Sequence, residues 1–333
     1  MKIEAKFPVI DLRCDLLSYL VSEPNASVNE TRYMGASLPH LLKGNVKLQV
    51  MAIYSSTQPG SSKWGMEQAK KFKQLQDLRE FKAFDFNEDE NKWLKEDGVF
   101  MLPAIENASA FCEEDEPLKI GFKRLEKIQE YTGQLLYISL THHYENRFGG
   151  GNYSPNVGLK DDGRALLSYL DGKGIALDLA HTNDALAEQA LFFIQKNNLN
   201  IRVIASHSNF RDVWEHVRNL PLELAQEIIL QKGLIGINFL RDYIHPSEAP
   251  TIFTHITFGL MNGAENSLAL GADFFYTPWI TDAKRFPLFF SKMSNASHYP
   301  SVLKDLNKEV QNEKLVRKIA YENVIKFIKR GQG

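Results

Sequence analysis

The amino-acid sequence predicts an α/β fold, a (β/α)8 TIM barrel that forms a single domain over residues 1–333. Three observations predict it: eight short apolar runs, helical segments between most of them, and the absence of a linker or repeat that would divide the chain. The length would also suit two domains, but barrels of this kind often reach about 250 residues or more as one unit.

The eight apolar runs are the predicted strands. Several are apolar throughout instead of alternating, which is typical of strands buried on both faces of a parallel sheet. Gly, Asn and Asp, which favour turns, occur in the segments between them. The runs are Phe7–Leu12, Val46–Tyr54, Val99–Ile105, Leu135–Leu140, Gly174–Ala180, Ile201–Ser206, Leu234–Phe239 and Ser267–Ala272.

Start and stop signals predict helices between the strands. Asn183 suits the N-cap of one helix, and Pro221 suits the first turn of another, which Gly233 ends. The apolar face of the first of these helices is predicted to contain Leu186, Ala190, Leu191 and Ile194.

Insertions are predicted after the second and seventh strands, where the connections are longer than a barrel requires. The first, residues 55–98, contains a helical segment around Met66–Phe81 and an acidic stretch, Asp85–Asp97, that is predicted to be solvated. The second, Arg241–Ala264, is predicted to form a lid or a subunit contact.

Composition indicates which class of partner and which cellular compartment to expect. The chain has 39 Lys and Arg against 41 Asp and Glu, so its net charge of −2 favours neither nucleic acid nor an anionic membrane, and a small-molecule partner is expected. Cys14 and Cys112 are too few for a disulfide framework and indicate a reducing compartment. Because Met1–Pro8 lacks the apolar stretch of a signal peptide and no run approaches about 18 apolar residues, a cytoplasmic location is expected.

Polar residues follow most of the predicted strands, at the end of the barrel where active sites of this fold lie. Clustered carboxylates and imidazoles are costly unless a cation organises them, so their convergence favours a metal site. These residues are Arg13, Asp15, Glu106, His142, His143, His181, His207 and Asp273.

Glu106, His181 and His207 form the two-histidine, one-carboxylate set of a catalytic zinc with an open position for water. Asp273, if close to that water, would take its proton and pass it to a leaving amine. The alternatives are that Asp273 caps a loop and that His207 bonds a backbone carbonyl.

Several segments together resemble the membrane (renal) dipeptidases, peptidase family M19, which are related to the amidohydrolases. The resemblance runs from about Ile10 to the end of the chain. The matching segments are Leu140-Thr-His142, Gly158-Leu with Gly163-Arg, Leu177-Asp-Leu-Ala-His181, Ala205-Ser-His207-Ser, Val217-Arg-Asn-Leu-Pro221, Gly271-Ala-Asp273-Phe and Glu322-Asn323.

The resemblance implies a role for each matching residue. Glu106 matches a carboxylate that bridges two zinc ions, His181 and His207 match ligands of one ion, and Asp15 and Asp273 match positions around the other. His142 matches a histidine that polarises the scissile carbonyl. Arg218, with Asn219 beside it, matches the arginine that binds the terminal carboxylate of the substrate, a task that suits the guanidinium fork.

One position departs from the family pattern. Where the family has a metal-binding histidine in a His-x-Asp pair, this chain has Arg13, followed by Cys14 and Asp15. Arginine has no lone pair to offer, so one metal position should be lost, and the charge of Arg13 is expected to lie near Asp15 and Asp273 in its place and to hold Asp273 ionised. Cys14 should point to the opposite side, into the core.

The sequence thus predicts a zinc-dependent hydrolase with one ion per chain that cleaves a dipeptide or similar small amide. His142 would stabilise the oxyanion and Asp273 would move the proton. The alternative is a catalytically weak or inactive relative that binds small molecules, which Arg13 favours; a metal-independent lyase or isomerase leaves the pairing of His181 with His207 unexplained. The resemblance also implies a homodimer.

Overall fold

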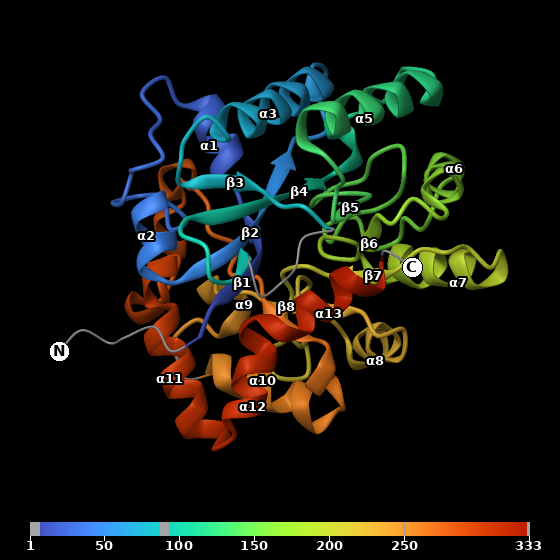
Figure 1. Ribbon diagram of the computed structural model, residues 1–333. Coiled ribbons are helices and arrows are strands. Elements are labelled where there is room, and N and C mark those ends of the chain that lie inside the picture. Colours follow the sequence, from blue (N-terminus) through green and yellow to red (C-terminus); the bar gives the residue numbers. More distant parts are fainter. Residues whose placement is uncertain (1–6, 87–92, 249–250, 332–333) are drawn as a thin grey trace.

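Eight parallel strands close into a barrel in the computed structural model, which describes residues 7–86, 93–248 and 251–331 (Figure 1). The strands follow the order β2-β1-β9-β8-β7-β6-β5-β4, and pairing between β2 and β4 completes the ring. The predicted (β/α)8 barrel is confirmed. Its strands are β1 (Val9–Cys14), β2 (Val46–Tyr54), β4 (Val99–Glu106), β5 (Tyr137–Ser139), β6 (Ala176–Asp178), β7 (Val203–Ala205), β8 (Leu234–Ile237) and β9 (Leu268–Leu270).

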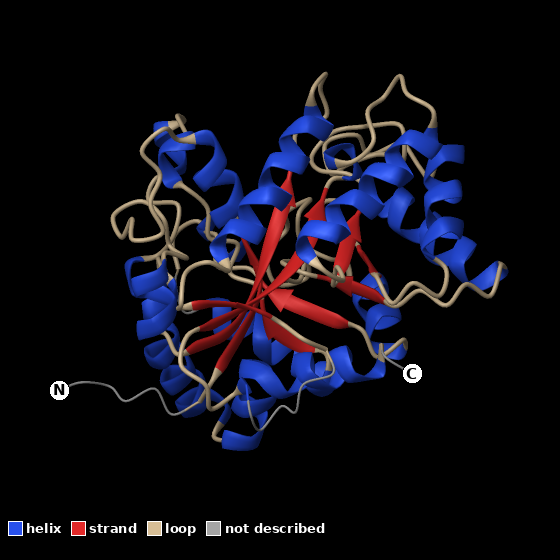
Figure 2. Ribbon diagram, turned by 45° about the horizontal axis from the view of Figure 1, so that its top comes forward, coloured by secondary structure: helices blue, strands red, loops and turns tan. Residues whose placement is uncertain are grey.

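Helices surround the barrel and cover the outer face of its strands (Figure 2). Each buries apolar side chains, and together the helices remove the outer face of the parallel sheet from water. They are α1 (Leu16–Ser22), α2 (Leu38–Lys43), α3 (Ser61–Leu75), α5 (Leu118–Thr132), α6 (Asp161–Leu170), α7 (Asp184–Lys196), α8 (Leu222–Leu230), α9 (Arg241–Ile244), α10 (Thr251–Met261), α11 (Tyr299–Val310), α12 (Glu313–Arg317) and α13 (Asn323–Arg330).

The helices predicted from their start signals, α7 and α8, form at the predicted places. The side-chain oxygen of Asn183 accepts a hydrogen bond from the backbone N–H of Leu186 at 2.7 Å and so caps α7. Pro221 occupies the N-cap position of α8, one residue earlier than its expected place in the first turn. The predicted apolar face of α7 is buried.

The insertion after β2 differs from its prediction. The helix α3 begins at Ser61 and ends at Leu75, and Phe81 instead begins a short strand, β3 (Phe81–Ala83), which pairs with β4. The predicted solvated stretch is also partly wrong, because Trp93 is buried and packs edge-on against Phe100 of β4. Trp93 is thus buried although the stretch around it is acidic. Residues 87–92 of this stretch lie outside the described residues.

Two glycines allow three neighbouring strands to approach closely at the end of the barrel that carries the predicted site. A Cβ atom on Gly236 or on Gly271 would lie 2.0 Å from the carbonyl oxygen of Ser206. The backbone around His207 is therefore in direct contact with the ends of β8 and β9. Among the described residues, no helix is both long and apolar enough to cross a membrane.

A buried hydrogen bond joins the first strand to the last part of the chain. Asp11 in β1 accepts the backbone N–H of Arg13 at 2.8 Å through Oδ1, and its Oδ2 accepts the hydroxyl of Tyr299 in α11. Burial raises the pKa of Asp11 to about 6, even though these hydrogen bonds act in the opposite direction. Tyr299 thereby helps to fix the backbone that carries Arg13.

Replacing Tyr299 with phenylalanine should destabilise the protein. The change removes the donor to a buried carboxylate, which typically costs about 1–3 kcal/mol in the free energy of unfolding. Urea unfolding followed by circular dichroism measures this loss. Tyr144→Phe is the control, because Tyr144 is 68% exposed; equal stability of the two variants would contradict the structural role of the Tyr299 hydroxyl.

Candidate active site

The polar side chains that follow the strands converge at one end of the barrel. Glu106 ends β4, His181 and His207 follow β6 and β7, and Asp273 follows β9. All four are buried, as is Arg13 in β1. The parallel strands bring these residues together because their carboxyl ends meet at the same rim.

Glu106, His181 and His207 form a cluster whose donor atoms all lie within 4.8 Å of one another. The Nε2 atoms of the two histidines are 2.9 Å apart, and the Oε1 atom of Glu106 lies 2.9 Å from His181 and 3.4 Å from His207. Two imidazole nitrogens and a carboxylate oxygen turned toward one point are the ligand set of a catalytic zinc ion, so these residues fit a metal.

Hydrogen bonds behind His207 turn its free nitrogen toward the cluster. The Oγ of Ser206 donates to the Oδ2 of Asp178 at 2.7 Å, so it acts as acceptor for the Nδ1–H of His207, also at 2.7 Å. This assignment leaves the lone pair of His207 on Nε2, where a metal would bind. Asp178 itself is held by the backbone N–H groups of Ala180 and Ser206.

The backbone is strained at two site residues. His181 and Asp273 have φ angles of 69° and 64°, in the left-handed region that side-chain-bearing residues rarely adopt. Such strain persists only where the surroundings impose it, and it is concentrated at functional sites. Burial, together with the charge of Arg218, also lowers the pKa of His181 well below its ordinary value, so its imidazole is neutral at neutral pH.

Arg13 binds three carboxylates at once. Its two terminal amino groups contact both carboxylate oxygens of Glu106, one of them lies 2.9 Å from Asp15, and its Nε lies 3.7 Å from Asp273. Burial alone would lower the pKa of Arg13, but the three carboxylates raise it well above the ordinary value. The side chain is therefore a permanent cation in the centre of the site.

The carboxylates respond to this cation in different ways. Burial would raise the pKa of Glu106, but Arg13 and His181 hold it well below its ordinary range. For Asp15, burial outweighs the attraction of Arg13 and raises the pKa to about 7. Asp273 is fixed from its other side, where its Oδ2 accepts the amide of Asn238 at 3.0 Å.

These residues face a cavity of about 160 Å³. His142 lines this cavity, and its ring packs against that of His181. The hydroxyl oxygen of Tyr54 lies 3.5 Å from the Nδ1 of His142. Burial lowers the pKa of His142 to about 4, so the ring is neutral near pH 7 and has one N–H to donate. The other lining residues are Arg13, Asp15, Glu106, His143, His181, Leu240, Tyr243, Asp273, Phe275, Trp279, Ile280 and Arg285.

Arg218 and Asn219 lie behind this cavity. One terminal nitrogen of Arg218 is 3.2 Å from the Nε2 of His181, and its buried Nε has no hydrogen-bond acceptor within the described ranges. The amide of Asn219 donates to the carbonyl oxygens of Trp214 and Tyr243, each at 2.9 Å. Asn219 thus links the backbone of Trp214 to that of Tyr243 in α9. The substrate-binding roles of Arg218 and Asn219 stay predictions.

Sequence reasoning missed part of the cavity wall. The sequence predicts no role for His143 beyond its place after a strand, but the centre of its ring lies 4.0 Å from that of His142 and 4.8 Å from that of His181. The signal was present, because His143 also follows β5. Tyr54 pairs with Glu106 across β2 and β4, and residues 275–285 form an irregular segment whose course no periodic pattern predicts.

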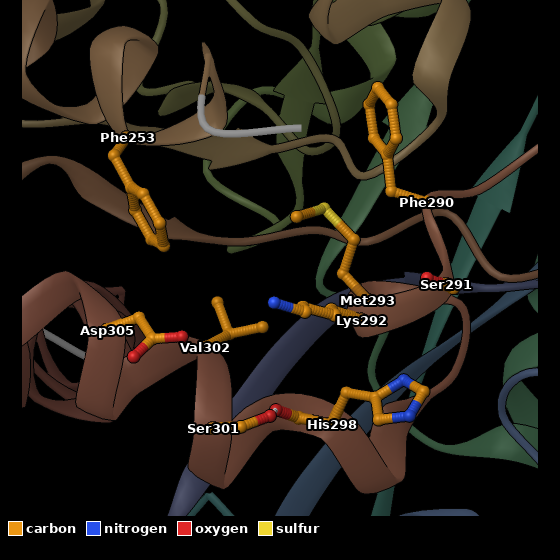
Figure 3. Close-up of a pocket in the computed structure, with 9 residues that line it drawn as sticks. All are labelled: Phe253, Phe290, Ser291, Lys292, Met293, His298, Ser301, Val302 and Asp305. Atoms are coloured by element: carbon orange, nitrogen blue, oxygen red, sulfur yellow. Dashed lines mark hydrogen bonds between the residues drawn. The ribbon is translucent and has the colours of Figure 1, made fainter. Parts of the chain in front are cut away.

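A second cavity, of about 610 Å³, lies between α10, α11 and the segment that connects β9 to α11 (Figure 3). Its walls are mainly apolar, with Phe253, Phe290, Met293 and Val302 around the hollow, while Lys292, His298 and Asp305 supply polar groups. It contains none of the residues of the carboxylate and imidazole cluster, so it is distinct from the candidate active site.

A model of the membrane dipeptidase family, peptidase family M19, matches residues 1–332 of the chain. The chain belongs to this family. The match confirms the resemblance seen in the sequence. An uncharacterized dipeptidase of Schizosaccharomyces pombe is 26% identical over 179 residues, which cover 50% of this chain and 42% of that protein. The aligned part is thus less than half of that relative.

Two solved metallopeptidase structures share the fold. The dipeptidase AC, a metallopeptidase of family M19, has a TM-score of 0.82 at 18% identity, with 98% of both chains covered. A metallopeptidase from Rhodobacter sphaeroides, liganded with a phosphinate mimic of the dipeptide L-Ala-D-Ala, has a TM-score of 0.81 at 18% identity, with 97% of this chain and 99% of that chain covered.

Arg13 and the two carboxylates beside it, those of Asp15 and Asp273, do not form a set of metal ligands. The guanidinium of Arg13 has no lone pair to offer a metal. Asp15 and Asp273 are both in contact with Arg13 instead. The cluster of Glu106, His181 and His207 remains open to one ion.

Replacing Ser206 with alanine should weaken metal binding about 10- to 100-fold, because it removes the partner that orients His207. Chelator competition with purified protein measures the change in affinity. Ser208→Ala is the matched control, since the buried hydroxyl of Ser208 has no hydrogen-bond partner within the described residues. The orienting role of Ser206 is refuted if both variants bind metal like the wild type.

Proposed function

We propose that this member of family M19 is a zinc-dependent hydrolase that cleaves dipeptides or similar small amides with one metal ion per chain. The observation that carries the proposal is the convergence of Glu106, His181 and His207 on one point, with Arg13 bound to both oxygens of Glu106. The family membership supports the hydrolase, and the contacts of Arg13 support the single ion.

The charges around Glu106 support one divalent ion. Three carboxylates, those of Asp15, Glu106 and Asp273, contact a single guanidinium. When all three are ionised, the three carboxylates and the guanidinium together carry a net charge of −2. One divalent cation would neutralise this net charge. A second cation would be repelled by Arg13 at short range.

The protein's own groups would then share the work of hydrolysis. A zinc ion in such a site supplies a Lewis acid that makes water nucleophilic near neutral pH. As the water oxygen bonds to the carbonyl carbon, Asp273 takes the proton from water and later delivers it to the amide nitrogen, so that the C–N bond breaks to give a carboxylic acid and an amine. His142 donates its N–H to the developing oxyanion.

The size of the site supports a small substrate. A cavity of about 160 Å³ suits a dipeptide better than a folded protein chain. Arg218, with its buried and unpaired Nε, would bind the terminal carboxylate of that substrate. Asn219 would support this function by holding the carbonyl of Tyr243, which lines the cavity.

A second candidate function rests on Arg13 alone. Because this guanidinium already satisfies Glu106 in two places, the site is partly neutralised without any metal. A protein of this kind would bind small carboxylates or peptides without cleaving them. Metal content separates the two candidates.

Protein purified without chelator or added zinc should contain about one zinc ion per chain by mass spectrometry, as a three-ligand site predicts. Replacing His181 with alanine should remove it. Replacing Arg13 with histidine should raise the content toward two ions, because the substitution restores a ligand.

The matched control for this experiment is Arg13→Lys, which keeps the positive charge and offers no imidazole, and which should stay at one ion or fewer. Wild-type protein that takes up no zinc even when it is supplied would favour the binding protein. An Arg13→His variant that gains no second ion would contradict the argument that Arg13 alone excludes it.

Asp273→Asn should lower kcat for a dipeptide about 100- to 10,000-fold, the usual contribution of a positioned acid or base, while zinc content is unchanged. Steady-state kinetics together with metal analysis check both parts. Asp161→Asn serves as the control, since the side chain of Asp161 is fully exposed. Retention of wild-type kcat in Asp273→Asn would remove Asp273 from the proton pathway.

A further inference from the structure

Arg285 lines the candidate active-site cavity on the side formed by residues 275–285. Trp279 and Ile280 from the same segment lie along this wall, together with Tyr243 from α9. The side chain of Arg285 is one third exposed, so it is neither fixed in the core nor directed entirely into solvent. Apart from Arg13, it is the cation among the lining residues, and Arg13 is already occupied by three carboxylates.

The contacts of Arg285 leave one end of its guanidinium unused. Its Nε donates to the Oδ2 of Asp242 at 2.9 Å, and its backbone carbonyl accepts a hydrogen bond from Arg241 at 3.1 Å. Neither of its two terminal amino groups has an acceptor within residues 7–86, 93–248 and 251–331. The side chain is therefore held in place through Nε while a pair of donors stays free.

Arg285 and Arg218 both contact α9, whose Tyr243 lines the cavity. The guanidinium carbon of Arg218 lies 5.2 Å from the centre of the Tyr243 ring, and Arg285 pairs with Asp242, the neighbour of Tyr243 in α9. Both arginines also contribute to lowering the pKa of His143, behind the larger effect of burial. A substrate whose terminal carboxylate is bound by Arg218 would place the side chain of that same residue near Arg285.

We propose that Arg285 determines specificity for dipeptides whose C-terminal residue carries an acidic side chain. The free amino pair of its guanidinium would bind the side-chain carboxylate of aspartate or glutamate, while Arg218 binds the terminal carboxylate. This inference rests on the proposed dipeptidase function and names its substrate class.

The test compares two peptides that differ in charge but hardly in shape, Ala-Glu and Ala-Gln, with zinc-loaded protein. The wild type should have a value of kcat/KM for Ala-Glu about 10- to 100-fold above that for Ala-Gln, the range expected for a charge-assisted pair of hydrogen bonds. Arg285→Gln should abolish this preference by lowering kcat/KM for Ala-Glu, and Arg285→Lys, which keeps the positive charge, should retain part of it.

Lys284→Gln is the matched control, because it removes the adjacent positive charge from an exposed side chain that does not line the cavity. This variant should keep the preference for Ala-Glu. Equal rates for Ala-Glu and Ala-Gln in the wild type, a preference that survives Arg285→Gln, or a charge preference confined to Glu-Ala over Gln-Ala would each overturn the role of Arg285.

Binding of phosphinate mimics of Ala-Glu and Ala-Gln, measured by calorimetry, separates this inference from the proposed function. Tighter binding of the Ala-Glu mimic, lost in Arg285→Gln, would support the inference independently of turnover. Equal binding of both mimics would overturn the role of Arg285 and leave the dipeptidase function intact. Binding of neither mimic would overturn both.

Discussion

The carboxylate of Glu106 is the group on which the rest of this site depends. It is fully buried, and a buried carboxylate is stable only among cations and hydrogen-bond donors. The guanidinium of Arg13 contacts both of its oxygens, and one of them, Oε1, also faces the imidazoles of His181 and His207. Arg13 in turn holds Asp15 and Asp273. A single anion thus sets the positions of the fixed cation, the metal ligands and the proposed proton carrier.

Hydrogen bonds outside this cluster keep its members in place. Asp178 acts through Ser206 on His207, and Asn238 acts on Asp273. These supporting groups also lie at or just beyond strand ends, so the rigidity of the barrel reaches the site through one or two contacts. The strained backbone at His181 and Asp273 is consistent with this arrangement, because only a rigid surrounding sustains it.

The sequence predicted the barrel and most of the cluster for a simple physical reason. Strands buried on both faces must be apolar, so a polar residue directly after such a run, like His181 or Asp273, stands out. The wall formed by residues 275–285 gave no such signal, because irregular backbone has no period, and Arg285 could be placed only from contacts distant in the sequence. Trp93 shows the opposite limit: this aromatic side chain is buried, although it belongs to an acidic stretch that composition predicted to be solvated and whose Lys95 and Asp97 are exposed.

The hydrogen bond between Tyr299 and Asp11 joins residues 288 positions apart. A ribosome makes the first strand, with Arg13 in it, long before it makes the helix that supplies this tyrosine. Until then the nascent chain carries a cationic side chain and a carboxylate in a segment destined for the interior, without the partners that make their burial tolerable. The hydrogen bond can therefore form only after α11 has been made, and a chain released before Tyr299 would lack the donor to the buried carboxylate of Asp11.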